Sequence, residues 1–168
     1  MEERSRRILA DVFGAGDRAL QEVMRPRTEE TFIDGTMSIA DARSMVRDGP
    51  NSRFPVIGRT PDDVLGFVHI RDLMPRDKHQ DQGMVKDIVR EILPLPGTNR
   101  VLPSLSRMRK LGHHIALVVD EYGGTDGIVT LEGLVEEPVG EIYDEYDTGP
   151  TTRTASPWPT DPSTWTAA

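Results

Sequence analysis

The chain has 168 residues, enough for one domain or two small ones, and it carries a formal net charge of −8 and no cysteine. Disulfides, thiolate catalysis and cysteine-type zinc sites are therefore excluded. No apolar run approaches the ~18 residues of a membrane-spanning helix, and the charged start, residues 1–7, is unlike a signal peptide. We expect this piece of chain to be soluble and to suit a cytosolic setting.

Negative charge is concentrated in the second half of the chain. No Lys or Arg occurs from Leu111 to Thr152, while Asp and Glu recur along that stretch. Such a surface repels nucleic acid and anionic lipid, so neither is an expected partner. Two interpretations stay open, namely a solvated acidic face that aids solubility and a surface that attracts divalent cations.

The first half of the chain is predicted to alternate between short helices and strands. Apolar residues at helical spacing indicate the helices, Gly14 and Gly16 end the first of them, and Asp17 is the predicted cap of the second. The predicted elements are helices at 2–13 and 18–24, a strand at 31–33, a helix at 39–47 capped by Ser38, strands at 53–57 and 64–70, a helix beginning at 71–74 before Pro75, and a polar linker at 75–83.

The second half is predicted to follow the same order. Its predicted elements are a strand at 92–95, a helix from 101 or 102 to 111, strands at 115–119 and 127–131, and a helix at 134–142. The continuous apolar runs predict strands that are buried on both faces. Residues 148–168 are rich in Thr and Pro and contain no aliphatic residue larger than Ala, so we expect a disordered tail or a linker.

The order of elements repeats because the sequence repeats. Residues 66–73 (Gly-Phe-Val-His-Ile-Arg-Asp-Leu) align with residues 127–134 (Gly-Ile-Val-Thr-Leu-Glu-Gly-Leu), and residues 54–57 align with 115–118 at the same offset. A repeat of this length indicates a structural module that occurs twice. The predicted fold is α+β, with two β-α-β-β-α modules that share a core and pack with pseudo-twofold symmetry.

Several strings within this repeat resemble a known family. The repeat itself is similar to the cystathionine-β-synthase (CBS) domain, which works in tandem pairs. The strings that narrow the resemblance are Val-Met-Arg-Pro-Arg-Thr at 23–28, Ser-Arg-Phe-Pro-Val at 52–56, Val-Asp-Glu-Tyr-Gly-Gly-Thr-Asp-Gly-Ile-Val-Thr-Leu-Glu at 119–132 and Val-Gly-Glu-Ile-Tyr-Asp-Glu-Tyr-Asp at 139–147. They resemble the CBS pair of CorC/HlyC-type magnesium and cobalt efflux proteins, bacterial relatives of the cyclin-M transporters.

The resemblance covers about residues 1–147 and implies a domain division. It implies an N-terminal helix at 1–16, a first CBS module at 17–77, a second CBS module at 84–147 and a disordered tail or linker at 148–168. It also implies a regulatory, non-enzymatic module of a membrane magnesium and cobalt transporter, on the cytoplasmic side of the cell membrane. Such a module binds ATP or AMP, with or without magnesium, between its two halves and forms a homodimer.

The resemblance further implies which residues contact the nucleotide. Carried over by motif, the nucleotide-binding residues are Arg27, Thr28, Arg53, Phe54, Asp72, Thr130 and Glu132, with no catalytic residue and no metal ligand. The chemistry agrees with the motif, because a strand that ends in Thr before a helix with an acid in its first turn offers a hydroxyl, helix-start N–H groups and a carboxylate. Purely structural roles stay open as alternatives to nucleotide contact. Thr130 is then only a strand residue, and Asp72 is only an acid that complements a helix dipole.

Each copy of the motif departs from the family pattern at one position. The second copy has Thr130 but Gly133 where the family has Asp, although Glu132 precedes it, and the first has Asp72 but His69 in the Thr position. Pro138 is a further departure, because proline inside a helix removes a hydrogen bond. We therefore expect nucleotide binding weaker than with the full motif, and the alternative function is a structural dimerisation module with a degenerate site. No nucleophile–base pair, phosphate loop or His-Glu-x-x-His string indicates an enzyme.

Overall fold

The computed structural model describes residues 3, 6, 14, 16–74 and 80–136. Most of the predicted N-terminal helix, the end of the predicted last helix with Pro138, and the predicted tail at 148–168 lie outside these residues. None of the helices described is long and apolar enough to cross a membrane.

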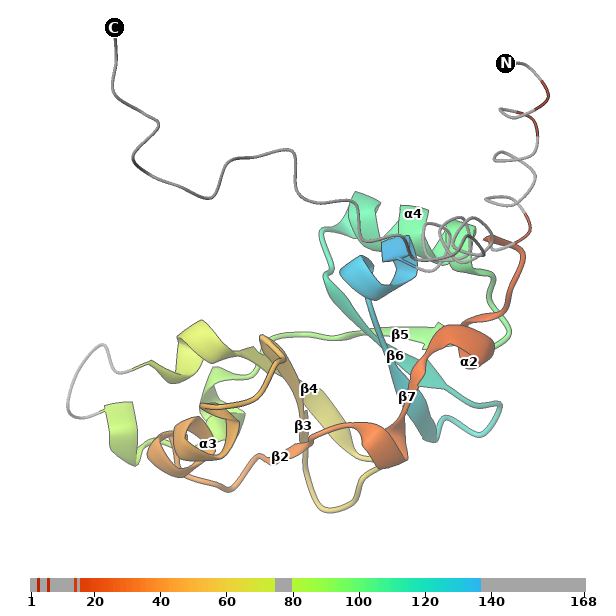
Figure 1. The fold of residues 1–168 in the computed structure, drawn as a ribbon. Coiled ribbons are helices and arrows are strands. Elements are labelled where there is room, and N and C mark those ends of the chain that lie inside the picture. Colours follow the sequence, from red (N-terminus) through yellow and green to blue (C-terminus); the bar gives the residue numbers. More distant parts are fainter. Residues whose placement is uncertain (1–2, 4–5, 7–13, 15, 75–79, 137–168) are drawn as a thin grey trace, which may run out of the picture.

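Two small sheets form the centre of the two modules (Figure 1). In the first sheet, β2 (Ile33–Asp34) runs parallel to β3 (Arg53–Ile57), which pairs antiparallel with β4 (Val64–His69). In the second sheet, β5 (Leu93–Pro96) runs parallel to β6 (Ile115–Val119), and β6 pairs antiparallel with β7 (Thr125–Thr130). The second sheet has one more strand, β1 (Arg25–Pro26), which pairs antiparallel with β7.

Helices connect and flank these strands. The two longest are α3 (Ile39–Val46) in the first module and α4 (Val101–Leu111) in the second. The shorter elements are α2 (Leu20–Val23), the 3-10 turns η1 (Arg27–Glu29), η2 (Ile70–Leu73), η3 (Gln80–Gln82) and η4 (Val85–Ile88), and a helical turn at 131–136. The predicted order of strands and long helices is therefore confirmed.

Local chemistry explains where α3 and α4 begin and end. Ser38 caps α3 as predicted, because its Oγ accepts the N–H of Asp41 at 3.1 Å. The last turn of α4 ends at Gly112, whose φ of 73° lets its N–H and the N–H of His113 reach back to carbonyls of that turn. Ser38 thus fixes the beginning of α3, and Gly112 fixes the end of α4.

The segment that leads into each module is bound by the other module. We call residues 18–26 the first leading segment and residues 83–91 the second. The first donates from Leu20 N to Asn99 O at 2.8 Å, and the second donates from Val85 N to Met37 O at 3.0 Å. β1 pairs with β7 at Arg25 and Ile128, and Arg90 pairs with Phe67 of β4 in the same way. This reciprocal exchange gives the chain its pseudo-twofold symmetry.

The exchange explains the glycine that opens the repeated signature. A Cβ on Gly66 would lie 2.1 Å from the carbonyl oxygen of Arg90, and a Cβ on Gly127 would lie 2.3 Å from that of Arg25. Gly66 also has a φ of 151°, which side-chain-bearing residues rarely adopt. Each glycine is thus required because the backbone of a leading segment passes directly over it.

Three apolar clusters hold the fold together. The first module is built on Ile33, Ile39, Ala42, Val46, Phe54, Val56, Val68, Leu73 and Val85, and the second on Leu20, Leu95, Val101, Met108, Ala116, Val118, Val129 and Leu134. A third cluster joins the modules through Ile115, Leu117 and Ile128, packed against Val64, Phe67, Ile92 and Val119. Because β6 contributes alternate residues to the second and third clusters, it is buried on both faces, as predicted.

The structure corrects several details of the prediction, and one of them is that the last predicted helix begins at residue 131 rather than at 134. The helix predicted at 18–24 is shorter, and its cap position is Ala19 rather than Asp17, whose carboxylate accepts a hydrogen bond from Arg100 Nη1 at 2.8 Å instead. The helix predicted to begin at 71–74 is a 3-10 turn. Strand β1 was not predicted; Pro26 is tolerated in it because β1 lies at the edge of its sheet, where a missing N–H costs no ladder bond.

Candidate functional site

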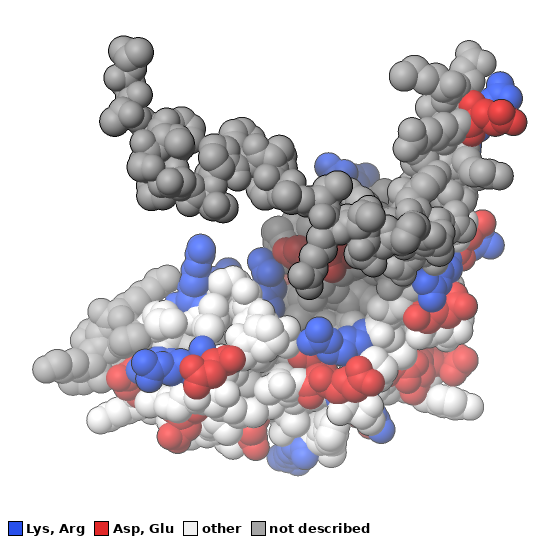
Figure 2. Space-filling model, viewed as in Figure 1, with Lys and Arg blue, Asp and Glu red and all other residues white. Residues whose placement is uncertain are grey.

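A cleft of about 920 Å³ lies between the two modules. Its walls come from the first leading segment and η1, from the residues that open β3, and from β7 with the helical turn after it. The lining residues are Arg18, Val23–Pro26, Glu29, Glu30, Pro50–Arg53, Ile115, Ile128–Thr130, Glu132–Leu134 and Glu136. Figure 2 shows this face of the molecule, hollowed between the modules, with Lys and Arg side chains beside the hollow.

The cleft combines an apolar wall with charged groups of both signs. Ile115, Ile128 and Val129 supply the apolar part from β6 and β7. Arginines and glutamates supply the charges, namely Arg18, Arg25 and Arg53 against Glu29, Glu30, Glu132 and Glu136. An apolar slot with a few convergent polar groups is the usual composition of a small-molecule site.

Thr130 stands where β7 ends and the helical turn at 131–136 begins. Its Oγ1 accepts the backbone N–H of Gly133 at 3.1 Å, so it caps that turn. The hydroxyl hydrogen remains available to donate to a bound group. Gly133 lies close beneath it, because a Cβ there would be 3.0 Å from Thr130 Oγ1. Thr130 can therefore both hold the turn and contact a ligand.

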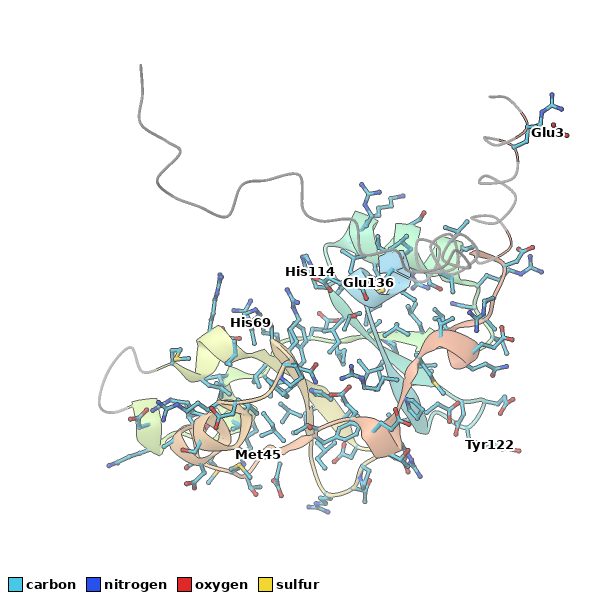
Figure 3. The ribbon with its side chains drawn as sticks, in the orientation of Figure 1. Glu3, Met45, His69, His114, Tyr122 and Glu136 are labelled. Carbon is cyan, nitrogen blue, oxygen red and sulfur yellow. The ribbon has the colours of Figure 1, made fainter. Side chains whose placement is uncertain are left out.

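Arg53 and Glu132 face each other across the cleft. Arg53 Nη1 lies 3.7 Å from Glu132 Oε1, and His114 Nδ1 lies 3.7 Å from the same oxygen. Arg53 is only 22% exposed whereas Glu132 is 58% exposed. Figure 3 shows His114 near the start of β6. The guanidinium of Arg53 is thus held at the cleft by a loose ion pair that an anion can replace.

Glu30 is an ionisable group buried in the cleft wall. Its side chain is only 5% exposed, Oε1 accepts the backbone N–H of Thr31 at 3.1 Å, and Oε2 lies 3.8 Å from Arg25 Nη1. Burial raises the pKa of this carboxyl, although the N–H of Thr31 and the charge of Arg25 oppose the rise. Sequence reasoning missed Glu30, because an acid in a polar stretch is usually exposed.

Arg25 is a second cleft residue that the motifs did not imply. It donates from Nη1 to Asn51 Oδ1 at 3.3 Å and lies beside Glu30. A signal for it was present in the sequence, since Val23-Met24-Arg25 in the first leading segment matches Ile88-Val89-Arg90 in the second. Extending the repeat upstream in this way places Arg25 and Arg90 at equivalent positions.

Three of the seven residues implied by the motif line the cleft, and four do not. Arg53, Thr130 and Glu132 line it together. Phe54 is instead buried in the first core, and Arg27 pairs through Nη1 with Asp62 Oδ1 at 3.0 Å. Thr28 lies exposed in η1, outside the lining. The seventh residue, Asp72, belongs to the equivalent place in the other module.

We call the region around Arg25, Thr130 and Gly133 the Thr130 half-site, and its counterpart at His69, Asp72 and Arg90 the His69 half-site. In the counterpart, Asp72 accepts two hydrogen bonds from Arg90, at 2.7 and 2.6 Å, and a third from the backbone N–H of His69 at 3.1 Å. The hydrogen bonds from Arg90 hold the pKa of Asp72 below its usual value. The carboxylate of Asp72 is therefore already occupied.

His69 takes the place of Thr130 in the counterpart. Its Nδ1 accepts the backbone N–H of Arg71 at 3.1 Å, so a ring nitrogen caps η2 in place of a hydroxyl. Burial lowers the pKa of His69, and the charges of Arg53 and Arg71 lower it further. A neutral ring that accepts through Nδ1 fits this role. Within the described ranges, no group of three acidic or His side chains is arranged to hold a metal ion.

Comparison with known proteins agrees with this architecture. The family model described as "CBS domain" matches residues 20–77. A protein of Rickettsia akari named "Possible hemolysin C" is 38% identical over 143 residues, which are 84% of this chain and 48% of that protein. The chain thus spans about half the length of this relative.

Solved structures extend the likeness to both modules. A hemolysin-like protein containing a CBS domain, from Oenococcus oeni, is 30% identical, with a TM-score of 0.71 over 77% of this chain and 96% of the other. The CBS domain of a bacterial CNNM/CorC family Mg²⁺ transporter, solved in complex with ATP, is 28% identical, with a TM-score of 0.75 over 82% of this chain and 98% of the other.

Proposed function

Because this chain belongs to the CBS-domain family, as the CBS pair of a CNNM/CorC-type protein, we propose that it is a regulatory module that binds an adenine nucleotide in the cleft of the Thr130 half-site. The observation that carries the proposal is the cleft itself. It joins an apolar wall, the Thr130 hydroxyl and the partly buried guanidinium of Arg53. A related CBS domain of 28% identity is known in complex with ATP.

The cleft offers each part of a nucleotide a suitable surface. Ile115 and Ile128 present an apolar wall to a base, which is flat and largely apolar. Arg53 presents a guanidinium to phosphate oxygens, which accept charge-assisted hydrogen bonds. Thr130 adds a hydroxyl that is fixed by its bond from Gly133. Among the residues implied by the motif, these contacts make Arg53 and Thr130 the strongest candidates, with Glu132 as the acid that Arg53 leaves when an anion binds.

Regulation follows from the way the cleft is assembled. Its walls belong to the first leading segment, to β3 of the first module and to β7 of the second. A nucleotide that touches all three favours the conformation in which they are close, and it shifts the equilibrium by its difference in affinity for the two states. In the longer protein, we propose that this shift acts on a membrane domain that transports magnesium or cobalt, with the CBS pair on the cytoplasmic side.

The experiment is isothermal titration calorimetry of this chain with ATP and AMP, each with and without Mg²⁺. We expect saturable binding that Thr130→Ile weakens at least tenfold, because the branched apolar side chain removes the hydroxyl and fills the cleft. Thr60→Ile is the matched control, since Thr60 is exposed in the turn between β3 and β4. If the folded chain binds neither nucleotide, with or without Mg²⁺, the proposal is contradicted.

A second function is favoured by one observation, which is that Gly133 offers no carboxylate to a ribose. On this alternative the chain is a structural dimerisation module. Apolar side chains that are exposed on the modules, among them Met45, Leu111 and Val135, are available for a homodimer interface. Light scattering after size-exclusion chromatography measures the dimer, and the melting temperature with and without ATP separates the two functions, since only a bound ligand raises it.

A further inference from the structure

Glu30 differs from every other acid of the cleft in being buried. We propose that Glu30 is a specificity-determining residue, whose carboxylate accepts a hydrogen bond from the exocyclic amino group of adenine and so selects 6-aminopurine nucleotides against 6-oxopurine nucleotides. This inference rests on the proposed nucleotide-binding function of the same cleft. Glu30 is not among the site residues that the motifs of the repeat imply.

The geometry leaves one oxygen of Glu30 for a ligand. Oε1 is held by the backbone N–H of Thr31 at 3.1 Å. Arg25 Nη1 lies 3.8 Å from Oε2, which is too far for a hydrogen bond, and that same nitrogen donates to Asn51 Oδ1 at 3.3 Å. Within the part of the chain that the structure describes, Oε2 therefore receives charge from Arg25 but no hydrogen bond.

The chemistry of a carboxylate then decides which purine fits. An ionised carboxylate only accepts hydrogen bonds. The 6-amino group of adenine donates a hydrogen bond, whereas the 6-oxo group of hypoxanthine or guanine accepts one. A 6-oxopurine therefore places its oxygen against the carboxylate oxygen of Glu30, so that two acceptors face each other. In the complex, a base that presents an acceptor leaves this carboxylate oxygen without a hydrogen bond, which costs free energy. Burial thus makes Glu30 selective.

The other acids of the cleft are poorer candidates for this role. Glu132 is 58% exposed and lies near both Arg53 and His114. Glu29 and Glu136 are exposed as well. Water competes for the oxygens of an exposed carboxylate, so a base gains little by replacing it. The raised pKa of Glu30 agrees with its desolvation, which Thr31 and Arg25 compensate only in part.

The charge of Glu30 also orients the ligand. A carboxylate repels phosphate groups, so the triphosphate lies away from Glu30 and towards the guanidinium of Arg53 on the β3 wall. The base then lies at the end of the cleft formed by η1 and the first leading segment. Arg25 balances part of the negative charge while Asn51 holds its guanidinium in place.

The test compares ATP with inosine triphosphate by isothermal titration calorimetry of the whole chain. The unsubstituted chain should bind ATP at least about tenfold more tightly. Glu30→Gln should reverse or abolish that preference, because its amide oxygen keeps the bond from Thr31 N–H and its amino group then faces the base as a donor. Glu91→Gln, an exposed acid outside the cleft, is the matched control and should leave the ratio unchanged.

The outcomes separate this inference from the function it rests on. If ATP does not bind the unsubstituted chain at all, the proposed function fails and this inference fails with it. If ATP binds but Glu30→Gln leaves the ratio of the two affinities unchanged, only the inference is overturned. It is also overturned if Glu30→Gln changes the preference for ATP over 2′-deoxy-ATP instead, because the carboxylate would then contact the ribose.

A second measurement covers the case in which Glu30→Gln does not fold, which its melting curve without ligand reveals. The unsubstituted chain is titrated with the triphosphate of purine riboside, which has hydrogen in place of the 6-amino group. We expect affinity at least about tenfold below that of ATP, since the hydrogen bond to Glu30 is lost. Equal affinity for the two overturns the inference.

Discussion

The His69 half-site and the Thr130 half-site occupy equivalent places in the two modules, yet they use their charged groups differently. In the first, Asp72 accepts two hydrogen bonds from Arg90. In the second, Gly133 replaces the acid, and the equivalent arginine, Arg25, donates to Asn51 instead. In the His69 half-site, the carboxylate and the arginine therefore bind each other. In the Thr130 half-site, the groups that line the cleft can bind a ligand.

A motif residue is therefore informative only together with its partners. Asp72 is the acid that the family pattern asks for, but in this chain it is already bound within the protein. Thr130 lacks that acid but lines, together with Arg53, a cleft of about 920 Å³.

The largest effect is expected where the leading segments cross the repeated glycines. Gly66→Ala places a methyl group against the carbonyl of Arg90 at a strained φ, and Gly127→Ala places one against that of Arg25. Each should lower the free energy of unfolding by about 3 kcal/mol, measured by urea denaturation. Gly49→Ala is the control, because its Cβ meets only an ordinary contact at 3.5 Å. Equal stability of all three variants would show that the leading segments move aside easily.

The second prediction assigns nucleotide binding to one half-site. Thr130→Ile should weaken ATP at least tenfold, whereas His69→Ile should leave the affinity within about twofold, because His69 caps η2 in the half-site closed by Arg90. Thr130→Ser keeps the hydroxyl and should bind normally. Calorimetric titration of the three variants measures this. A greater loss in His69→Ile than in Thr130→Ile would reverse the assignment.

The third prediction adds the missing acid to the Thr130 half-site. Gly133→Asp should strengthen ATP binding several-fold, since Arg25 is engaged by Asn51 and the new carboxylate is left for the ribose hydroxyls. The gain should disappear with 2′,3′-dideoxy-ATP, and titration of both ligands measures it. Weaker binding of ATP would mean that the new acid forms an ion pair with Arg25, as Asp72 does with Arg90.

The smallest effect is expected from pH at the His69 half-site. The hydrogen bonds from Arg90 lower the pKa of Asp72 in the folded protein. The ionised carboxylate therefore stabilises the fold at pH values above the pKa that Asp72 has in the unfolded state, and this contribution is lost as the pH falls through the pKa of the folded state. Asp72→Asn should therefore be less stable than the unsubstituted chain near pH 7 but equally stable in strong acid. Urea unfolding at both pH values measures this, with Asp87→Asn as the control. A difference that persists in acid would show that the hydrogen bonds of Asp72 do not depend on its charge.

Much of the fold could be predicted from local signals. The strands β3 and β6 and the helix α4 were predicted with their observed bounds, because a continuous apolar run or a helical apolar face determines each of them. The exchange of the leading segments could not be predicted in this way. Strand β1 has two residues, one of them proline, and its partner β7 lies far along the chain, so no local pattern indicates the pair.

The candidate site was predictable only where a sequence motif supplies its residues. Arg53 and Thr130 follow from their motifs and line the cleft. Phe54 follows Arg53 in the same string, but successive residues of a strand point to opposite faces, so Phe54 enters the first core. The burial of Glu30 depends on the packing of the first leading segment against the second module, which the residues around it do not reveal.

The stoichiometry of ATP binding, measured by isothermal titration calorimetry on the unsubstituted chain, tests the contrast between the half-sites most directly. We predict one ATP per chain, because the Thr130 half-site is open to a ligand while Asp72 and Arg90 satisfy each other in its counterpart. Two ATP molecules per chain would contradict the account, since the His69 half-site would then bind as well. No binding to the folded chain would contradict it equally.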